Sequence, residues 1–250
     1  MRDIKAALFF SLLVYFSNVS AEQTVQFSSN DKQNIMVELF TSQGCSSCPP
    51  AEHWLNGFEH NEKLWNEIVP IAFHVDYWDN LGWPDPYAKH AYSARQYRHQ
   101  QQAHIRSVYT PGVLANGQEW RGWIRGKNFP KVINNAGILS FNANPKTIEV
   151  AYSKASKENV LNIALLGIGI ETRVERGENK GKVLQQDFVA LSHDMYSAGK
   201  SDGKGKWVIP LPSDTLKHAQ RYALAVWISS MDDIAPVQST GYWLPNEWFE

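Results

Sequence analysis

Hydrophobic and polar positions follow two different patterns along the chain, and the change falls at the breaker cluster Asn142–Pro145. Upstream of it, apolar runs of strand length alternate with segments whose apolar residues recur at helical spacing. The predicted order, β-α-β-α-β-β-α, favours parallel pairing of the first strands and a closing hairpin at Asn116-Gly117. The predicted strands are 35–40, 69–77, 113–115 and 119–123, and the predicted helices are 49–58, 85–103 and 128–137.

Downstream of the cluster, the sequence changes to short runs that either alternate or are continuously apolar. About seven such runs in a hundred residues predict an immunoglobulin-like β-sandwich. We therefore divide the chain into a first domain, 22–143, and a β-rich domain, 144–250, which has no catalytic constellation and is expected to bind a partner or cover the first domain. The predicted strands of this second domain are 147–152, 160–166, 168–173, 183–191, 206–211, 223–229 and 237–243.

The first 21 residues have the pattern of a secretory signal peptide. Arg2 and Lys5 form a positively charged start, Ala6–Phe16 is apolar, and Val19-Ser20-Ala21 is a small-residue cleavage site. The apolar stretch is shorter than the about 20 residues that a transmembrane helix needs. An uncleaved membrane anchor is the alternative, but the flanking residues favour cleavage, a periplasmic or secreted protein, and no membrane association after cleavage.

Charge and cysteine content narrow the function classes. The chain has 24 Lys and Arg residues against 25 Asp and Glu residues, a formal net charge of −1. This balance gives no electrostatic attraction for nucleic acid or for anionic membranes. There are only 2 cysteines in the sequence, and a single close pair in an exported protein favours a redox role over a disulfide framework.

The two cysteines, Cys45 and Cys48, follow the first predicted strand directly, and Pro49-Pro50 fits the first turn of a helix. The unpaired N–H groups and the dipole at a helix N-terminus stabilise a thiolate, which is the species that attacks disulfides. We predict that Cys45 is the exposed, attacking thiolate and that Cys48 is the resolving thiol. The predicted function is disulfide exchange with the thiols or disulfides of exported proteins, supported by a redox partner protein and without a cofactor.

The order of elements, with the cysteine pair after the first strand and Thr110-Pro111 before the hairpin, resembles the thioredoxin fold. The resemblance implies an α/β, thioredoxin-like fold with a helical insertion over the first domain. A closer resemblance is to a secreted bacterial thioredoxin-like family of unknown function. The segments that carry this second resemblance are Val37–Pro50, His74–Asp79, Leu81-Gly82-Trp83 and Gly177-Glu178-Asn179.

The thioredoxin resemblance also implies roles for individual residues. Pro111 is expected to be cis and to face the cysteine pair, and Glu38 is expected to be the buried acid behind it. The substrate groove is assigned to Thr110, Gly44 and Trp78. Gly44 stands where thioredoxins have Trp, and Ser46-Ser47 matches neither the reducing nor the oxidising enzymes, so the direction of electron flow stays open.

Other interpretations of the same residues stay open. The cysteines could form a static structural disulfide in a redox-inactive binding module. With His53 or His74 they could bind zinc, or they could carry Cu(I), because thiolates are soft ligands. Glu38 could simply pair in the core. His74, Asp76 and Asp79 come at the end of the second strand, where α/β folds place their sites, yet such a polar strand exit is also typical of a turn.

Overall fold

The computed structural model describes residues 23–133, 135–198, 205–213, 216 and 218–249. The predicted signal peptide, residues 1–21, lies outside these residues. Within them, no helix is both long enough and apolar enough to cross a membrane.

The strands of the described residues are β1 (Val25–Ser28), β2 (Ile35–Thr41), β3 (Ile68–His74), β4 (Gly112–Ala115), β5 (Gln118–Glu119), β6 (Leu139–Ala143), β7 (Thr147–Tyr152), β8 (Asn159–Ile168), β9 (Ile170–Arg173), β10 (Val183–Gln186), β11 (Val189–Ser197), β12 (Lys206–Pro210), β13 (Arg221–Ser230) and β14 (Gln238–Leu244). The helices are α1 (Pro49–Asn56) and α2 (His90–Gln101), with the short 3-10 helices η1 (Gly57–His60), η2 (Asp76–Leu81), η3 (Gly122–Arg125) and η5 (Asn246–Trp248).

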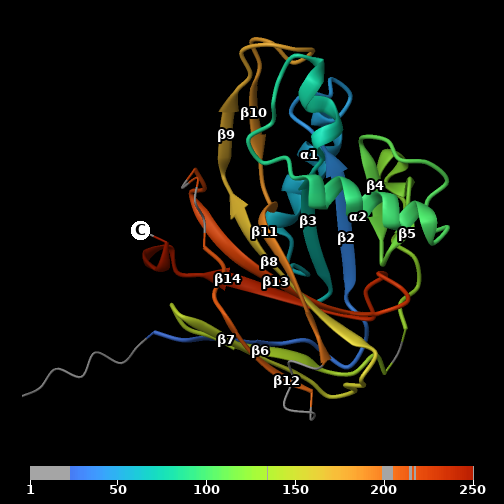
Figure 1. Cartoon of the computed structure of the whole chain (residues 1–250), viewed down its shortest axis with the longest axis vertical. Coiled ribbons are helices and arrows are strands. Elements are labelled where there is room, and N and C mark those ends of the chain that lie inside the picture. The colour runs from blue at the N-terminus through green and yellow to red at the C-terminus, as the bar shows by residue number, and fades with distance from the viewer. Residues whose placement is uncertain (1–22, 134, 199–204, 214–215, 217, 250) are drawn as a thin grey trace, which may run out of the picture.

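One eight-stranded sheet runs through the molecule in the order β14-β13-β8-β11-β3-β2-β4-β5 (Figure 1). β2 pairs with β3 in parallel and with β4 in antiparallel orientation. β11 continues the sheet beyond β3, and the backbone N–H of Ala72 donates to the carbonyl of Phe188 at 2.8 Å. Strands from both halves of the sequence therefore share one sheet.

Two smaller sheets complete the fold. The four-stranded sheet β1-β6-β7-β12 lies at the lower end of the molecule in Figure 1. The hairpin of β9 and β10 forms a separate two-stranded sheet, which stands beside α1 at the opposite end. The tip of this hairpin reaches the loop that carries the cysteine pair.

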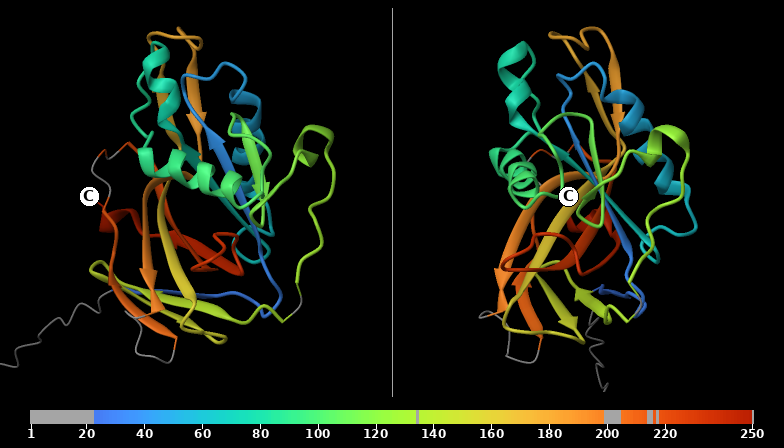
Figure 2. Two further views of the ribbon diagram at one scale, coloured as in Figure 1. Left: turned by 45° about the vertical axis from the view of Figure 1, so that its right-hand side comes forward. Right: turned by 90° about the vertical axis from the view of Figure 1, so that its right-hand side faces the viewer.

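The two helices cover opposite faces of the large sheet (Figure 2). Successive side chains of a strand point to opposite faces, and β2 follows this rule. Glu38 contacts Arg95 of α2, whereas the hydroxyl of Thr41 contacts Glu52 of α1. Side chains on the two faces of β2 therefore lie in two separate environments, one beside α2 and one beside α1.

The central strands β8 and β13 are buried on both faces. Ala164, Leu166 and Trp227 belong to a core with β2, β3 and both helices. Their neighbours Leu165 and Val226 face the four-stranded sheet and belong to a second core with β6, β7 and β12. Continuous apolar runs are typical of strands covered on both faces, and these runs have that structure.

The predicted fold class is wrong. The structure is mostly β-sheet, with 39% strand and 18% helix, and is not a thioredoxin-like α/β fold with a helical insertion. Nor do the C-terminal strands close on themselves as an immunoglobulin-like sandwich, because β8, β11, β13 and β14 extend the sheet that β2 and β3 begin. The local pattern identified most strands correctly, but it does not encode which strands become neighbours.

Two helix predictions also need correction. No helix forms between residues 128 and 137 in the described part of the chain; Pro130 interrupts it, and Ile133 instead exchanges backbone and side-chain hydrogen bonds with Gln33. The second helix begins at His90 rather than near Asp85. Asp85 is buried, and its carboxylate accepts hydrogen bonds from the backbone N–H groups of Gln43 and Tyr87.

Candidate functional site

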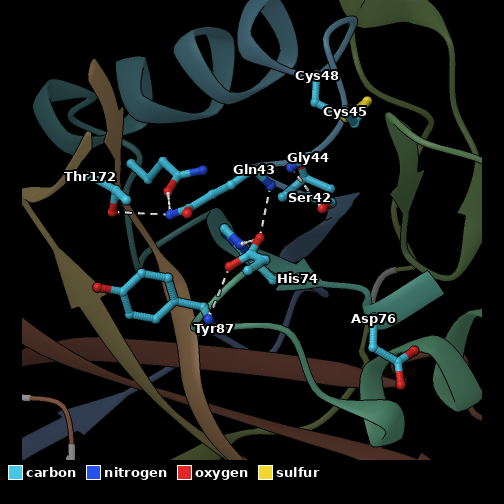
Figure 3. A network of polar contacts seen from close by, with 12 residues as sticks. Ser42, Gln43, Gly44, Cys45, Cys48, His74, Asp76, Tyr87 and Thr172 are labelled. Atoms are coloured by element: carbon cyan, nitrogen blue, oxygen red, sulfur yellow. Dashed lines mark hydrogen bonds and ion pairs between the residues drawn. A yellow bond between two sulfur atoms is a disulfide. The ribbon is translucent and has the colours of Figure 1, made fainter. Parts of the chain in front are cut away.

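Cys45 and Cys48 form a disulfide at the carboxyl end of β2, where the chain turns into α1 (Figure 3). Their Cα atoms are 5.5 Å apart, and Cys48 is the N-cap of α1. Pro49 and Pro50 occupy the first helical positions, as predicted, because those positions need no N–H donor. The backbone N–H of Cys45 donates to the carbonyl of Ser42 at 3.1 Å and tightens the turn.

Both cysteines are completely buried, although Ser46 and Ser47 between them are exposed. The prediction that Cys45 is exposed at the helix terminus is therefore wrong for the disulfide form. A segment more than a hundred residues further along the chain is hydrogen-bonded to this loop.

The tip of the β9–β10 hairpin, residues 174–182, is hydrogen-bonded to the loop that carries the cysteines. The side-chain amide of Asn179 donates to the carbonyls of Gln43 and Cys45, each at 2.9 Å. The carboxylate of Glu178 accepts the backbone N–H of Ser46 at 3.0 Å. Asn179 is itself fully buried, so its two hydrogen bonds to the loop are shielded from water, whereas Glu178 is exposed.

Gln43 links the loop to the base of the same hairpin. Its side-chain nitrogen donates to Gln186 at 2.8 Å and to Thr172 at 3.1 Å, and its side-chain oxygen accepts from the indole of Trp83 at 3.0 Å. Gln186 also donates to Glu52 at 2.9 Å. Figure 3 shows Gln43 with its bond to Thr172, together with the cysteine pair. Neutral amides thus satisfy most of the buried polar groups near the sulfurs.

Glu52 is the buried carboxyl group on the helix that carries Cys48. It follows Cys48 by four residues, so the two side chains share one face of α1. Burial raises the pKa of Glu52, and the nearby imidazole of His74 and the hydrogen bonds from Thr41 and Gln186 offset only part of this effect. The protonated form of Glu52 is therefore favoured to a higher pH than that of an ordinary glutamate.

His74 and Asp85 form a fully buried ion pair at 2.7 Å in the same region. Burial alone would lower the pKa of His74, but the carboxylate of Asp85 outweighs it and raises this pKa. Burial alone would raise the pKa of Asp85, but His74 and the N–H groups of Gln43 and Tyr87 lower it. The imidazole that could have served as a metal ligand is thus held by a carboxylate.

The other polar residues at the exit of β3 have structural contacts. Asp79 accepts the backbone N–H of Asp85 at 3.1 Å. Asp76 accepts from Ser93 and lies 3.2 Å from the ring of His90. His53 is exposed on α1. Among the described residues, no group of three or more His, Cys, Asp and Glu side chains is arranged to hold a metal ion.

Trp78 connects two of the predicted substrate-binding residues. Its Cβ atom lies 3.3 Å from the position that a side chain on Gly44 would occupy, and its indole donates to the hydroxyl of Thr110 at 2.8 Å. The Thr110–Pro111 bond is cis, as the resemblance implies. Thr110 and Pro111 are half-buried, so this wall of the site remains open to solvent.

Glu38 lies on the other face of the sheet. It forms an ion pair with Arg95 at 2.6 Å and lies 3.5 Å from His99, both residues of α2. Burial alone would raise the pKa of Glu38, but the guanidinium of Arg95 and the ring of His99 hold it far below the usual range. Its contacts are therefore with α2, and its predicted role as the acid behind the cysteines stays a prediction.

Sequence analysis did not assign roles to the hairpin tip or to Glu52. Gly177-Glu178-Asn179 was noted only as part of a family pattern, because nothing local links it to a cysteine 134 residues away. Glu52 could have been found, since the spacing Cys48–Glu52 places a carboxyl one turn below a sulfur on a helix. Gln43 and Gln186 gave no signal, because isolated glutamines rarely indicate a site.

Comparisons with known proteins come from sequence and from structure. Residues 36–229 match the family DUF1223, described as proteins of unknown function. No curated protein matches the chain. A crystal structure of a protein from Agrobacterium tumefaciens has a similar fold, with a TM-score of 0.53 and 20% identity over 85% of this chain and 94% of that chain. HBP35 of Porphyromonas gingivalis is also similar, with a TM-score of 0.48 and 12% identity over 86% of this chain and 76% of that chain.

Proposed function

Because the chain belongs to the DUF1223 family of proteins of unknown function, its function has to be inferred from the site, and we propose that it is a thiol–disulfide oxidoreductase. Its Cys45–Cys48 pair would exchange with thiols or disulfides of other exported proteins. The observation that carries the proposal is a disulfide at the N-terminus of α1 with a buried carboxyl of raised pKa on the same helix face. Such a helix terminus stabilises the thiolate that exchange requires.

The reaction conserves two electrons between the pair and its partner. A thiolate of the partner attacks the sulfur of Cys45, the Cys45–Cys48 bond breaks, and a mixed disulfide forms while Cys48 leaves as a thiolate and takes up a proton. A second partner thiolate then attacks the partner's own sulfur and releases Cys45. The partner is oxidised to a disulfide, this chain is reduced to two thiols, and the same steps run in reverse when the chain acts as reductant.

We assign to Glu52 the role of donating a proton to the Cys48 thiolate and of accepting it back. A carboxyl whose pKa is raised by burial keeps its proton to a higher pH than an ordinary glutamate, so it can donate that proton and accept it again. It lies one helical turn from Cys48, on the face that β10 and Thr41 cover. Supply of this proton to the leaving thiolate would favour the reduced form and speed each exchange step.

The decisive experiment measures the reduction potential of the mature protein together with its thiol content, with and without a chelator. An exchange protein should have a potential between about −270 and −120 mV. A value below about −300 mV is typical of a structural bridge and would reject the proposal.

Trapping provides the second arm of the experiment. In the variant Cys48→Ser, Cys45 should remain linked to partner proteins because no thiol is left to resolve the mixed disulfide. The matched control is the double variant C45S/C48S, which should trap nothing. Adducts that persist in the double variant would show that the captured proteins are not disulfide-linked partners.

A further inference from the structure

The hairpin tip contacts the cysteine loop through two side chains of different chemistry. Asn179 has one amide nitrogen with two N–H donors, and the two carbonyls of Gln43 and Cys45 use both of them. Its side-chain oxygen accepts from the ammonium of Lys182 at 2.8 Å. An aspartate, leucine or alanine at this position would leave the buried carbonyls of the loop without a donor.

Glu178 places a negative charge beside the same loop. Its carboxylate accepts the backbone N–H of Ser46, the residue that follows Cys45. This N–H belongs to the turn that leads into α1, where positive potential would otherwise be available to a sulfur anion. The carboxylate and a Cys45 thiolate therefore compete for one electropositive region.

The tip is built so that it can separate from the loop while its base stays fixed. At the base, Gln186 is buried and holds both Gln43 and Glu52. The tip contains Gly177 and Gly181 with φ of 75° and 83°, a conformation that other residues rarely adopt. A two-stranded hairpin outside a larger sheet has little stability of its own, so the closed tip depends on the contacts of Asn179 and Glu178 and on the packing of Gly177 against Gly82 and Trp83.

On the basis of the proposed function, we infer that Asn179 and Glu178 are positioning residues that set the reactivity of the disulfide. Asn179 holds the hairpin tip over the sulfurs and blocks their attack. Glu178 disfavours a thiolate at Cys45 as long as the tip is closed. A protein partner reaches the sulfurs by displacing the tip, so the hairpin also selects which thiols can react.

The first test measures how fast the disulfide is reduced by a small phosphine, followed through released thiols under native conditions. In Asn179→Ala, we expect reduction at least about tenfold faster, because the loss of two hydrogen bonds, at about 0.5–1.5 kcal/mol each, shifts the tip towards the open state. The matched control Lys180→Ala changes an exposed side chain of the same tip and should react like the parent.

General destabilisation is excluded with a remote variant. Val150→Ala removes buried methyl groups from the four-stranded sheet and lowers overall stability without a change near the cysteines. If V150A accelerates reduction as much as N179A, or if N179A reacts at the rate of the parent, the inference is wrong. Acceleration in N179A alone supports it.

The second test addresses the charge of Glu178. In Glu178→Gln, the carboxamide keeps an acceptor for the N–H of Ser46 but carries no charge. The alkylation rate of the reduced protein should then reach its half-maximum at a lower pH than in the parent. Glu52 of α1, His74 of β3 and Asp85 before α2 also face this region and are unchanged in the variant, so a shift reports Glu178. An unshifted profile overturns the role of Glu178.

These measurements separate the hairpin from the proposed function. Phosphine reduction needs no protein partner. If N179A is reduced faster than the parent but Cys48→Ser traps no protein, the shielding role of the tip is supported and exchange with protein partners is rejected. If Cys48→Ser traps partner proteins but phosphine reduces N179A and the parent at equal rates, exchange with protein partners is supported and the shielding role of the tip is rejected.

Discussion

Two buried glutamates on opposite faces of one sheet show how neighbours decide what a carboxyl group can do. Glu38 and Glu52 are both almost fully removed from solvent. Glu38 lies 2.6 Å from the guanidinium of Arg95, and its pKa is far below the usual range. Glu52 has only a hydroxyl and an amide as hydrogen-bond donors, and its pKa is raised.

The opposite pKa shifts of Glu38 and Glu52 indicate that these two carboxyl groups have different roles. Arg95 lies over the rings of Phe73 and Trp227, with centroid distances of 5.5 and 5.3 Å, so the ion pair with Glu38 fixes α2 to the sheet. The lowered pKa of Glu38 leaves it without a proton to donate, whereas the raised pKa of Glu52 lets this carboxyl hold a proton to a higher pH on the helix that carries Cys48. Burial alone is therefore a poor guide to a proton-transfer residue, and the charge of its partners is the better one.

The largest expected effect follows from removal of the partner of Glu38. Arg95→Met keeps an apolar side chain of similar length between the two aromatic rings but leaves the buried carboxylate without its guanidinium and with only the ring of His99 beside it. We expect the free energy of unfolding, measured by urea titration, to fall by about 3–5 kcal/mol.

The matched control for this variant is the double variant E38L/R95M, which should recover most of the loss because it buries no charge. A loss below about 1 kcal/mol in R95M would mean that the α2 cluster does not depend on charge pairing. The contrast with Glu52 would then disappear.

The two carboxyls should also give opposite pH signatures. The pKa of Glu38 is lowered in the folded state, so its stabilisation is present above an unfolded pKa of about 4.3 and is lost as the pH falls through the folded pKa. The pKa of Glu52 is raised, so it reduces stability once the pH rises above about 4.3. Relative to the parent, E38Q should therefore be less stable at neutral pH and similar in acid, whereas E52Q should be more stable at neutral pH and similar in acid.

Exchange kinetics sharpen this result. E52Q should also slow disulfide exchange about a hundredfold or more, at the low end of what a lost general acid or base costs. The reverse pattern, with slow exchange in E38Q and normal exchange in E52Q, would return the proton-transfer role to Glu38. Stability and exchange rates measured on both variants over the same pH range decide between the two.

Local pattern predicted most of the elements but not their assembly. The runs 35–40, 147–152 and 206–211 became strands with nearly the same ends because period and composition are local properties. The parallel pairing of β11 with β3 depends on a contact between Ala72 and Phe188, which no local pattern specifies. One clue was available in the run at 160–168, which is apolar except for Asn162 and Gly167. Such a run is typical of a strand covered on both faces, and an isolated outer strand does not need it.

The site, like the fold, was predictable only in its local part. The cysteine pair, its helix and the prolines follow from a short motif, and the structure has them where the motif places them. The contact of the hairpin tip with the loop does not follow from it, because Asn179 acts on carbonyls that any residue could provide. The role of Glu38 is predicted by analogy with another family, and only the position of Arg95 shows that its carboxylate is held in an ion pair.

The smallest expected effect concerns the open wall of the site, in contrast to its covered side. Trp78→Phe keeps the ring packed beside Gly44 but removes the hydrogen bond to Thr110, a loss of about 0.5–1.5 kcal/mol. Because Thr110 is assigned to the groove for an extended partner, exchange with protein disulfides should slow severalfold while reduction by a small phosphine stays unchanged. The conservative control is Thr110→Ser, which keeps the accepting hydroxyl and should behave like the parent in both assays. Equal slowing of both reactions in W78F would mean that Trp78 supports the cysteine loop itself, and the distinction between an open, partner-binding wall and a closed, shielding one would fail.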